Sequence, residues 1–404
     1  MSSRRVFVRD SALAMVGAGS APLWLKRALY GAPPSPRKKI LVAIFQRGAA
    51  DGLNVVAPHA EKAYYRMRPS IAIPRPAIGH AEAAIDLDGF FGLHPALASL
   101  EPLYAQRHLA IVHAAGSPDP TRSHFDAQDY MESGTPGHKG ANGGWMNRAL
   151  PAIPGKPSPV RAVSLGPTLS RAMAGRNPAI ALQAIDGFRV QDSTAAKQFE
   201  NMYIESKDPL MRSAGRETFE AVAMLQAIQK RPYTPGTGAE YPRTAFGESM
   251  RQIAQLIKSD VGVEMAFADI RNWDHHVNEP AQLTNRLSDF GQGLKAFWRD
   301  LGDHMADIAL VTMSEFGRTA RENGNRGTDH GHANCMFVMG GAVKGGKVYG
   351  DWPGLEQEQL YENRDLAVTT DFRDVLGELV LAHLGNPSID GVFPGYRPKP
   401  LGLL

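Results

Sequence analysis

Short apolar runs separated by polar, glycine-rich turns recur along the chain and predict an α/β protein with buried strands. The clearest run is Ile308–Met313, an apolar stretch rich in strand-forming residues, of the kind found in parallel sheets covered on both faces. A second apolar run, Cys335–Met339, ends at a pair of glycines. Further buried strands are predicted at Ile40–Phe45, Leu109–His113, Val160–Gly166, Ala179–Leu182 and Ala266–Ile270.

Between these runs, apolar residues recur every three or four positions, which is the spacing of helices with one buried face. The longest such stretch is Gln282–Leu301. The others are Ala96–Tyr104, Phe125–Glu132, Glu217–Lys230, Thr244–Ser259 and Phe372–Leu384. Strands that alternate with helices are typical of an α/β fold, and 404 residues suffice for one large domain of this class or two ordinary ones.

Polar residues with metal-binding chemistry lie next to several predicted strands. In open α/β sheets ligands bind beyond the carboxyl ends of the strands. An acidic residue follows two of the strands, and two clusters combine aspartate with histidine. They are Asp51, Glu315, Asp274-His275-His276 and Asp329-His330-Gly331-His332. Two of these positions also have an ordinary structural interpretation, Asp51 as a turn aspartate before glycine and the Asp274 segment as the entry to a helix.

Thr121 and Ser123 lie close to the start of the helix predicted from Phe125. Free backbone N–H groups at a helix N-terminus favour an anion. A hydroxyl there is either a helix cap or a nucleophile. Carboxylates and imidazoles beside a hydroxyl are what a hydrolase assisted by zinc or manganese requires. Arginines suited to binding phosphate or sulfate adjoin these candidates; they are Arg47, Arg122 and Arg318.

Composition and charge narrow the classes of partner. The hydrophobic content of 43% and charged content of 21% are typical of a globular protein. The first 32 residues hold five Lys/Arg and one acidic residue, so the remainder has a formal net charge of −1 and nothing indicates a nucleic-acid partner. The single cysteine, Cys335, excludes an intrachain disulfide and is expected to be a buried thiol.

The N-terminal segment, residues 1–32, carries a targeting pattern. Ser3-Arg4-Arg5-Val6-Phe7-Val8-Arg9 resembles the twin-arginine export motif, and the apolar stretch Ser11–Leu25 that follows is short and interrupted by glycine and proline. We expect no stable transmembrane span, engagement of the twin-arginine export machinery and a periplasmic or other extracytoplasmic location. The cleavage position stays open, and an uncleaved anchor is the alternative. Residues 33–404 are expected to form a single α/β domain.

Several segments together resemble the DUF1501 family of twin-arginine-exported bacterial proteins. They are FQRGAADGLN, TRSHFDAQDYMESG, WDHHVN, SEFGRT and GTDHGHA, and the resemblance runs from about Ile40 to the end of the chain. This family resembles the alkaline phosphatase/sulfatase superfamily. The resemblance implies an alkaline-phosphatase-like mixed, mainly parallel central sheet sandwiched by helices. It also implies one or two divalent metal ions and an anionic phosphate or sulfate ester as substrate.

Transferred by motif, the superfamily pattern makes Asp51 a metal ligand after the first strand and Ser123 the nucleophile, with Thr121 as the fallback. It makes Asp274 and His276 the mid-chain metal ligands, so that His275 is not a ligand. It makes His330 the late histidine ligand, with Asp329 or His332 as its neighbour.

The departure from this pattern is at Glu315-Phe316, where catalytic members of the superfamily have Asp-His. Glu315 is able to ligate a metal and Phe316 is not, which affects the second metal. Three alternatives stay open: a site with one metal, a site completed by Asp329, and a non-catalytic binding or assembly protein on the same fold.

Overall fold

A nine-stranded sheet organises the computed structural model, which describes residues 38–150, 157–185, 205 and 209–404. The strand order is β11-β5-β10-β9-β1-β8-β6-β7, and β12 also pairs with β5. Its strands are β1 (Ile40–Gln46), β5 (Leu109–Gly116), β6 (Ala162–Leu165), β7 (Ile180–Leu182), β8 (Met265–Ile270), β9 (Ile308–Met313), β10 (Asn334–Gly340), β11 (Val348–Tyr349) and β12 (Thr370–Asp371). A small separate sheet contains β2 (Val56–Ala57), β4 (Gly92–Leu93) and β3 (Ile85–Asp86), in that order.

Most strands of the main sheet run in the same direction. β1 is parallel to both β8 and β9, and β6 is parallel to both β7 and β8. Within the described part of the main sheet, only β10 runs against its neighbours, β9 and β5. The sheet is therefore mixed and mainly parallel, as expected. Because of this topology, the carboxyl ends of β1, β5, β6, β8 and β9 share one edge with the amino end of β10.

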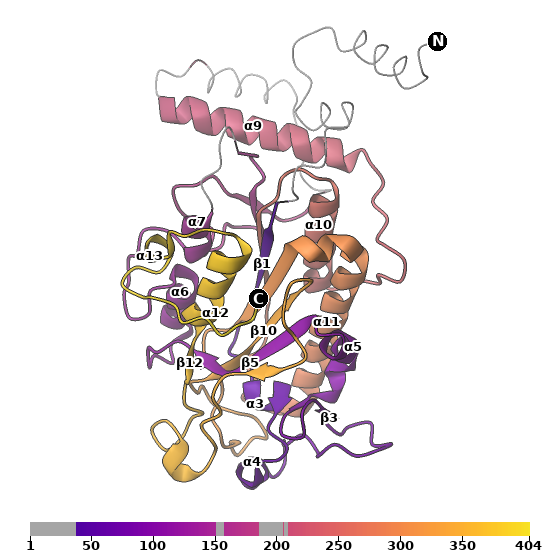
Figure 1. The fold of residues 1–404 in the computed structure, drawn as a ribbon, viewed down its shortest axis with the longest axis vertical. Helices are drawn as coiled ribbons and strands as arrows, with labels where there is room; N and C mark the ends of the chain where they lie inside the picture. Colours follow the sequence, from indigo (N-terminus) through magenta and orange to yellow (C-terminus); the bar gives the residue numbers. More distant parts are fainter. Residues whose placement is uncertain (1–37, 151–156, 186–204, 206–208) are drawn as a thin grey trace. The chain divides into compact units, whose positions relative to one another are not determined.

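Helices cover both faces of this sheet (Figure 1). In Figure 1, α10 and α11 lie on one side of the strands, while α6, α7, α12 and α13 lie on the other. The α-helices are α3 (Gly52–Val55), α4 (Lys62–Met67), α5 (Glu101–Ala105), α6 (His124–Ser133), α7 (Trp145–Ala149), α9 (Pro209–Gln229), α10 (Ala245–Lys258), α11 (Glu279–Leu301), α12 (Phe372–Glu378) and α13 (Ile389–Val392).

The alternating side chains of β1 explain this layering. Leu41 and Phe45 pack into one apolar core, with residues of α7 and α12, whereas Val42 and Ile44 pack into another, with residues of α10 and α11. Successive side chains of a strand point to opposite faces, so a strand covered on both sides is apolar throughout. The uniform apolar runs in the sequence have this origin.

Two segments predicted as continuous α-helices are each divided into two kinds of helix in the structure. The stretch predicted as a helix over Ala96–Tyr104 is a 3₁₀ segment, Pro95–Leu100, followed by α5. Pro102, in the first turn of α5, lacks the N–H that a continuous helix would need there. The helix predicted over Phe372–Leu384 is α12 followed by a π turn, Leu379–His383.

The expected export segment, residues 1–32, lies outside the described residues. The chain divides between Met1–Lys38 and Lys39–Leu404, and the sheets and helices described above belong to the second unit. No helix in the described part of the chain is both long and apolar enough to cross a membrane. Cys335 is a buried free thiol in β10.

Candidate metal centre

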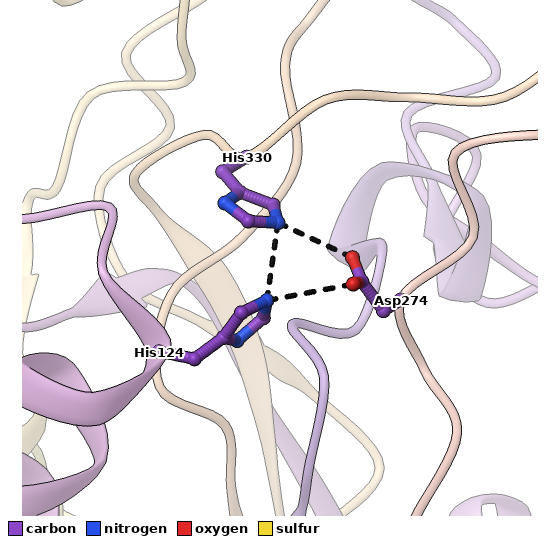
Figure 2. A group of neighbouring side chains, drawn as sticks. All are labelled: His124, Asp274 and His330. Carbon is purple, nitrogen blue, oxygen red and sulfur yellow. Dashed lines mark hydrogen bonds and ion pairs between the residues drawn. The ribbon is translucent and has the colours of Figure 1, made fainter.

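Three side chains from distant parts of the chain point toward one another at the carboxyl edge of the main sheet (Figure 2). His124 is the first residue of α6, Asp274 follows β8, and His330 precedes β10. The Nε2 atoms of His124 and His330 are 3.1 Å apart. The carboxylate of Asp274 lies 3.2 Å from Nε2 of His330 and 3.6 Å from Nε2 of His124.

A fourth side chain, His276, joins this group. Its Nε2 atom is 3.0 Å from Oδ1 of Asp274 and 3.1 Å from Nε2 of His330. On its other side, Nδ1 is 3.0 Å from Oδ1 of Asp329. We call His124, Asp274, His276 and His330 the histidine cluster. Of these four residues, the sequence predicted all but His124 as ligands.

The hydrogen bonds behind the imidazoles fix which ring nitrogen carries the proton. Nδ1 of His330 is 3.0 Å from the backbone carbonyl of Arg122, which only accepts, so Nδ1–H is the donor. Nδ1 of His124 is 2.9 Å from the Glu315 carboxylate, and Nδ1 of His276 contacts a carboxylate in the same way. Each neutral imidazole therefore presents a lone pair at Nε2, in the arrangement that orients histidine ligands in metal sites.

The spacing of these lone pairs fits a bound divalent cation. Nitrogen lone pairs about 3 Å apart repel unless a proton or a metal cation lies between them. Donors bound to one zinc ion at 2.0–2.1 Å are about 3.3 Å apart in a tetrahedral site. The distances among His124, Asp274 and His330, from 3.1 to 3.6 Å, bracket that value, and His276 lies 3.0–3.1 Å from the last two of these residues. The side chains of the histidine cluster are between 24% and 44% exposed.

Electrostatics keep the supporting carboxylates ionised. Burial alone would raise the pKa of Glu315, but hydrogen bonds from His124, Gln128 and the backbone of Gly48 hold that pKa below its ordinary value. Burial likewise opposes ionisation of Asp274, yet the hydrogen bond from Arg318 lowers its pKa. The pKa of His124 is raised, first by the hydrogen bond to Glu315. Ionised carboxylates behind and beside the imidazoles favour a cation at this point.

Close backbone approaches bring the segments together. The indole of Trp273 is fully buried and donates to the carbonyl of Ile270, which fixes the turn that presents Asp274. Gly48 has a φ of +117°, and a Cβ there would lie 2.7 Å from the backbone nitrogen of Asp274. A Cβ at Gly327 would lie 2.3 Å from the backbone of His276. Glycine is therefore required where the β1 and β10 segments pack against the β8 segment.

Arg318 was predicted to be suited to binding an anionic group, but in the structure its guanidinium has a structural role. The side chain is buried and donates to Oδ1 of Asp274 at 2.6 Å. It also donates to the carbonyls of Gly48, Trp273 and Thr328, and so joins the β1, β8 and β10 segments. Arg318 therefore positions the histidine cluster, and its guanidinium is buried away from solvent.

The remaining predicted ligands lie outside the histidine cluster. The carboxylate of Asp51 is buried and forms a two-point ion pair with Arg68. Nε2 of His332 donates to the carbonyl of Ser117 at 3.0 Å, and its ring packs against Tyr361. Glu315 and Asp329 support ligating imidazoles from behind. His275 is buried, and its pKa is lowered to about 4, mainly because burial disfavours the charged imidazole.

The predicted nucleophile and its neighbours lie at the start of α6. Ser123 occupies the N-cap position, but its hydroxyl makes no capping hydrogen bond and the residue is exposed. Oγ1 of Thr121 accepts a hydrogen bond from the Ser123 backbone at 3.3 Å. The Nη2 group of Arg122 pairs with Asp365 and Glu362, each at 2.6 Å, so two carboxylates already balance the charge of this side chain.

His124 is the residue that sequence reasoning missed. It directly follows Ser123 and begins α6, in the segment that leaves the carboxyl end of β5, just as the Asp274 segment leaves the carboxyl end of β8. A histidine at the start of a helix that follows a strand, with a glutamine four residues later, was the available signal. Gln128 hydrogen-bonds Glu315, which holds His124.

Comparisons with known proteins identify a family. A family model described as "Protein of unknown function (DUF1501)" matches residues 106–383. No curated protein sequence matches the chain. Similar solved structures include the PsFucS1 sulfatase from Pseudoalteromonas sp., with 11% identity, a TM-score of 0.38, and coverage of 96% of this chain and 73% of that one.

Two other solved structures are similar at a comparable level. The zinc complex of the C-terminal periplasmic domain of EcEptC from Escherichia coli has 7% identity and a TM-score of 0.34, and the match covers 76% of this chain and 74% of that one. A phosphonate monoester hydrolase of Agrobacterium radiobacter has 9% identity and a TM-score of 0.35, with coverage of 90% and 79%. At these scores the likenesses carry no weight for function, which depends on the site itself.

Proposed function

The chain belongs to the DUF1501 family, and we propose that it is a metal-dependent hydrolase or transferase of phosphate or sulfate esters. The observation that carries this proposal is the convergence of the His124 and His330 Nε2 atoms with the Asp274 carboxylate, with Nε2 of His276 beside the last two, while each Nδ1–H is already bound. These four side chains would hold one divalent ion, zinc or manganese. Such an ion neutralises an anionic ester and lowers the pKa of a neighbouring hydroxyl.

Ser123 is the proposed nucleophile. It adjoins the ligand His124, it is exposed, and its hydroxyl makes no capping hydrogen bond. The unpaired backbone N–H groups in the first turn of α6 favour the anionic part of an ester at this place. In the proposed reaction, a bond forms between Oγ and phosphorus or sulfur as the ester bond to the alcohol breaks. The serine proton leaves with the alcohol. Water or a second alcohol then takes the phosphoryl or sulfuryl group from Oγ, and the serine hydroxyl is restored.

Thr121 is the second choice, because its Oγ1 is already a hydrogen-bond acceptor for the Ser123 backbone. Arg318 and Glu315 have supporting parts: the first holds the Asp274 carboxylate in place, and the second orients the His124 ring. Rigid support of this kind is what keeps ligands in a productive geometry.

Export by the twin-arginine route and a periplasmic or other extracytoplasmic location are part of the same proposal. They are supported by the motif at Ser3–Arg9, which is typical of that route. The route carries folded proteins, so a protein could acquire its metal ion before export.

A non-catalytic protein with the same metal centre is the second candidate. It is favoured by two observations: Asp51 is neutralised by Arg68, and Phe316 packs against His124 and His330 with ring centroids 5.0 Å away in each case. An apolar ring and an ion pair at these places reduce the number of groups able to hold a second cation. This candidate predicts metal binding without turnover.

Metal content and turnover, measured on the full chain, separate these functions. We expect one zinc or manganese per chain by elemental analysis, and a loss of at least tenfold in metal affinity for His330→Ala. We expect Ser123→Ala to retain the metal and to lose turnover of 4-nitrophenyl phosphate and 4-nitrophenyl sulfate. A wild type that stays metal-free after incubation with zinc and manganese overturns the proposal. Metal binding without turnover of any ester favours the second candidate.

A further inference from the structure

A polar pocket of about 310 Å³ lies beside the histidine cluster, where β1, β6 and β8 end. Its walls include Arg47 after β1, the loop from Gly166 to Arg171 after β6, and Asp269 and Arg271 at the end of β8. The volume is at the lower end of the range for small-molecule sites. None of these residues has a part in holding the proposed metal ion.

The charged groups around this pocket balance one another. Arg47 pairs with Asp269 at 2.7 Å and with Glu132 at 2.9 Å. Arg171 pairs with Asp129 at 2.9 Å. These ion pairs cancel most of the attraction for a free anion, but they hold N–H donors and carboxylate acceptors in fixed positions. Fixed donors and acceptors of both kinds match a ligand rich in hydroxyl groups, since each hydroxyl both donates and accepts.

The loop after β6 adds a hydroxyl and an apolar surface. Thr168 is exposed and lines the pocket. The neighbouring Leu169 is 36% exposed and belongs to the pocket wall. A sugar ring has hydroxyls around its edge and C–H groups on its faces, so it complements a wall that combines fixed polar groups with an apolar side chain.

One side chain connects the pocket with the metal centre. Gln128 lines the pocket, accepts a hydrogen bond from Arg47 at 3.0 Å and donates one to Glu315 at 2.8 Å. Glu315 in turn contacts Nδ1 of His124. A molecule in the pocket is therefore separated from the ligand His124 by two side chains, and a substrate with a sugar part could reach both places.

We propose that this pocket binds an uncharged, hydroxyl-rich group, a sugar ring, which is the alcohol part of the ester substrate. The role of the sugar as part of a substrate rests on the proposed function, whereas sugar binding itself does not. The pocket would then select carbohydrate esters over esters of simple alcohols. Its contribution would be made by Asp269 and Arg271 as hydrogen-bonding groups, and by the loop from Gly166 to Arg171 as the opposite wall.

Saturation-transfer NMR with a panel of methyl hexosides tests this proposal on the full, zinc-loaded chain. We expect at least one methyl glycoside to bind with a millimolar dissociation constant. Two variants should weaken that binding at least tenfold: Thr168→Trp, which fills the pocket from an exposed loop position, and Asp269→Asn, which removes a carboxylate acceptor. The matched controls, Thr284→Trp and Asp351→Asn, alter exposed residues elsewhere and should leave binding unchanged.

The outcomes separate this proposal from the proposed function. Ser123→Ala should bind the glycoside as the wild type does, although it is expected to lose ester turnover. Glycoside binding without turnover of any ester contradicts only the proposed function. Turnover without glycoside binding, or glycoside binding that survives both pocket variants, overturns the sugar pocket. Binding of inorganic sulfate that strengthens in Asp269→Asn, with no glycoside bound, overturns it in favour of an anion subsite.

Discussion

Two polar clusters near the carboxyl end of β1 balance their charges in different ways. The first, which we call the sealed cluster, consists of Asp51, Arg68 and Glu279, all buried. The second is the histidine cluster, which is partly exposed. Both contain carboxylates that the surrounding residues hold in place, but the Asp51 carboxylate of the sealed cluster is buried in a two-point ion pair with Arg68.

Inside the sealed cluster, donors and acceptors satisfy one another. Arg68 lowers the pKa of Asp51 against the effect of burial, and it also donates to the carbonyls of Thr319 and Ala320. Burial, and then the negative charge of Asp51, raise the pKa of Glu279 well above its ordinary value, which favours the protonated form of Glu279. Within the sealed cluster the charge of Asp51 is balanced by Arg68.

The imidazoles of the two regions show the same contrast. His113, which feels the charge of Asp51, is buried and has both ring nitrogens bonded to backbone groups, at Val56 and Ala114. In the histidine cluster each Nδ1 atom is hydrogen-bonded to an oxygen, but each Nε2 atom faces another Nε2 atom or the Asp274 carboxylate. A carboxylate or an imidazole near a strand end therefore indicates a metal site only when the neighbouring residues leave one of its acceptor atoms without a donor.

Removal of Arg68 should have the largest effect, because it leaves the Asp51 carboxylate buried without a partner. We expect Arg68→Met to lower the free energy of unfolding by about 3–5 kcal/mol, measured by urea denaturation. The exposed Arg66, which pairs with the exposed Glu356, provides the matched control, and Arg66→Met should change stability little.

The metal content of the folded protein gives this prediction a second readout. Asp51→Asn should keep the same metal affinity as the wild type, since its carboxylate is occupied by Arg68. A drop in bound metal for Asp51→Asn would restore Asp51 as a ligand and would contradict the separation of the two clusters.

The contrast between the two clusters also explains which features of the fold and the site can be predicted from the sequence. Apolar runs predict the strands because a strand covered on both faces is apolar along most of its length, and the sheet edge where ligands bind follows from their order. The pairing of Asp51 with Arg68 was not predictable, because nothing local to Asp51 indicates which arginine folds back onto it. For the same reason Arg318 was mistaken for an exposed anion-binding residue.

The next largest effect should come from the carboxylate behind His276. Asp329 is 56% exposed, so Asp329→Ala should fold normally, but it removes the acceptor that orients the ring. We expect metal affinity to fall 10- to 100-fold, or about 1.4–2.7 kcal/mol, measured by competition with a chelator. Asp86→Ala is the matched control, because Asp86 contacts His59 in the same way, away from the histidine cluster. Unchanged affinity in Asp329→Ala would remove His276 from the ligand set.

The smallest predicted effect concerns pH and the sealed region. Burial lowers the pKa of His113 to about 4, whereas an imidazole in the unfolded chain titrates near 6.5. Between these values the unfolded chain binds the extra proton, so the stability that His113 contributes is complete above pH 6.5 and is lost as the pH falls toward 4. Without metal, in EDTA, the wild type should lose about 1.4 kcal/mol more than His113→Asn between pH 7.5 and 5.5. The exposed His80→Asn should follow the wild type. Equal pH dependence of wild type and His113→Asn would mean that His113 is protonated in the folded protein, and the region around Asp51 would then not be sealed.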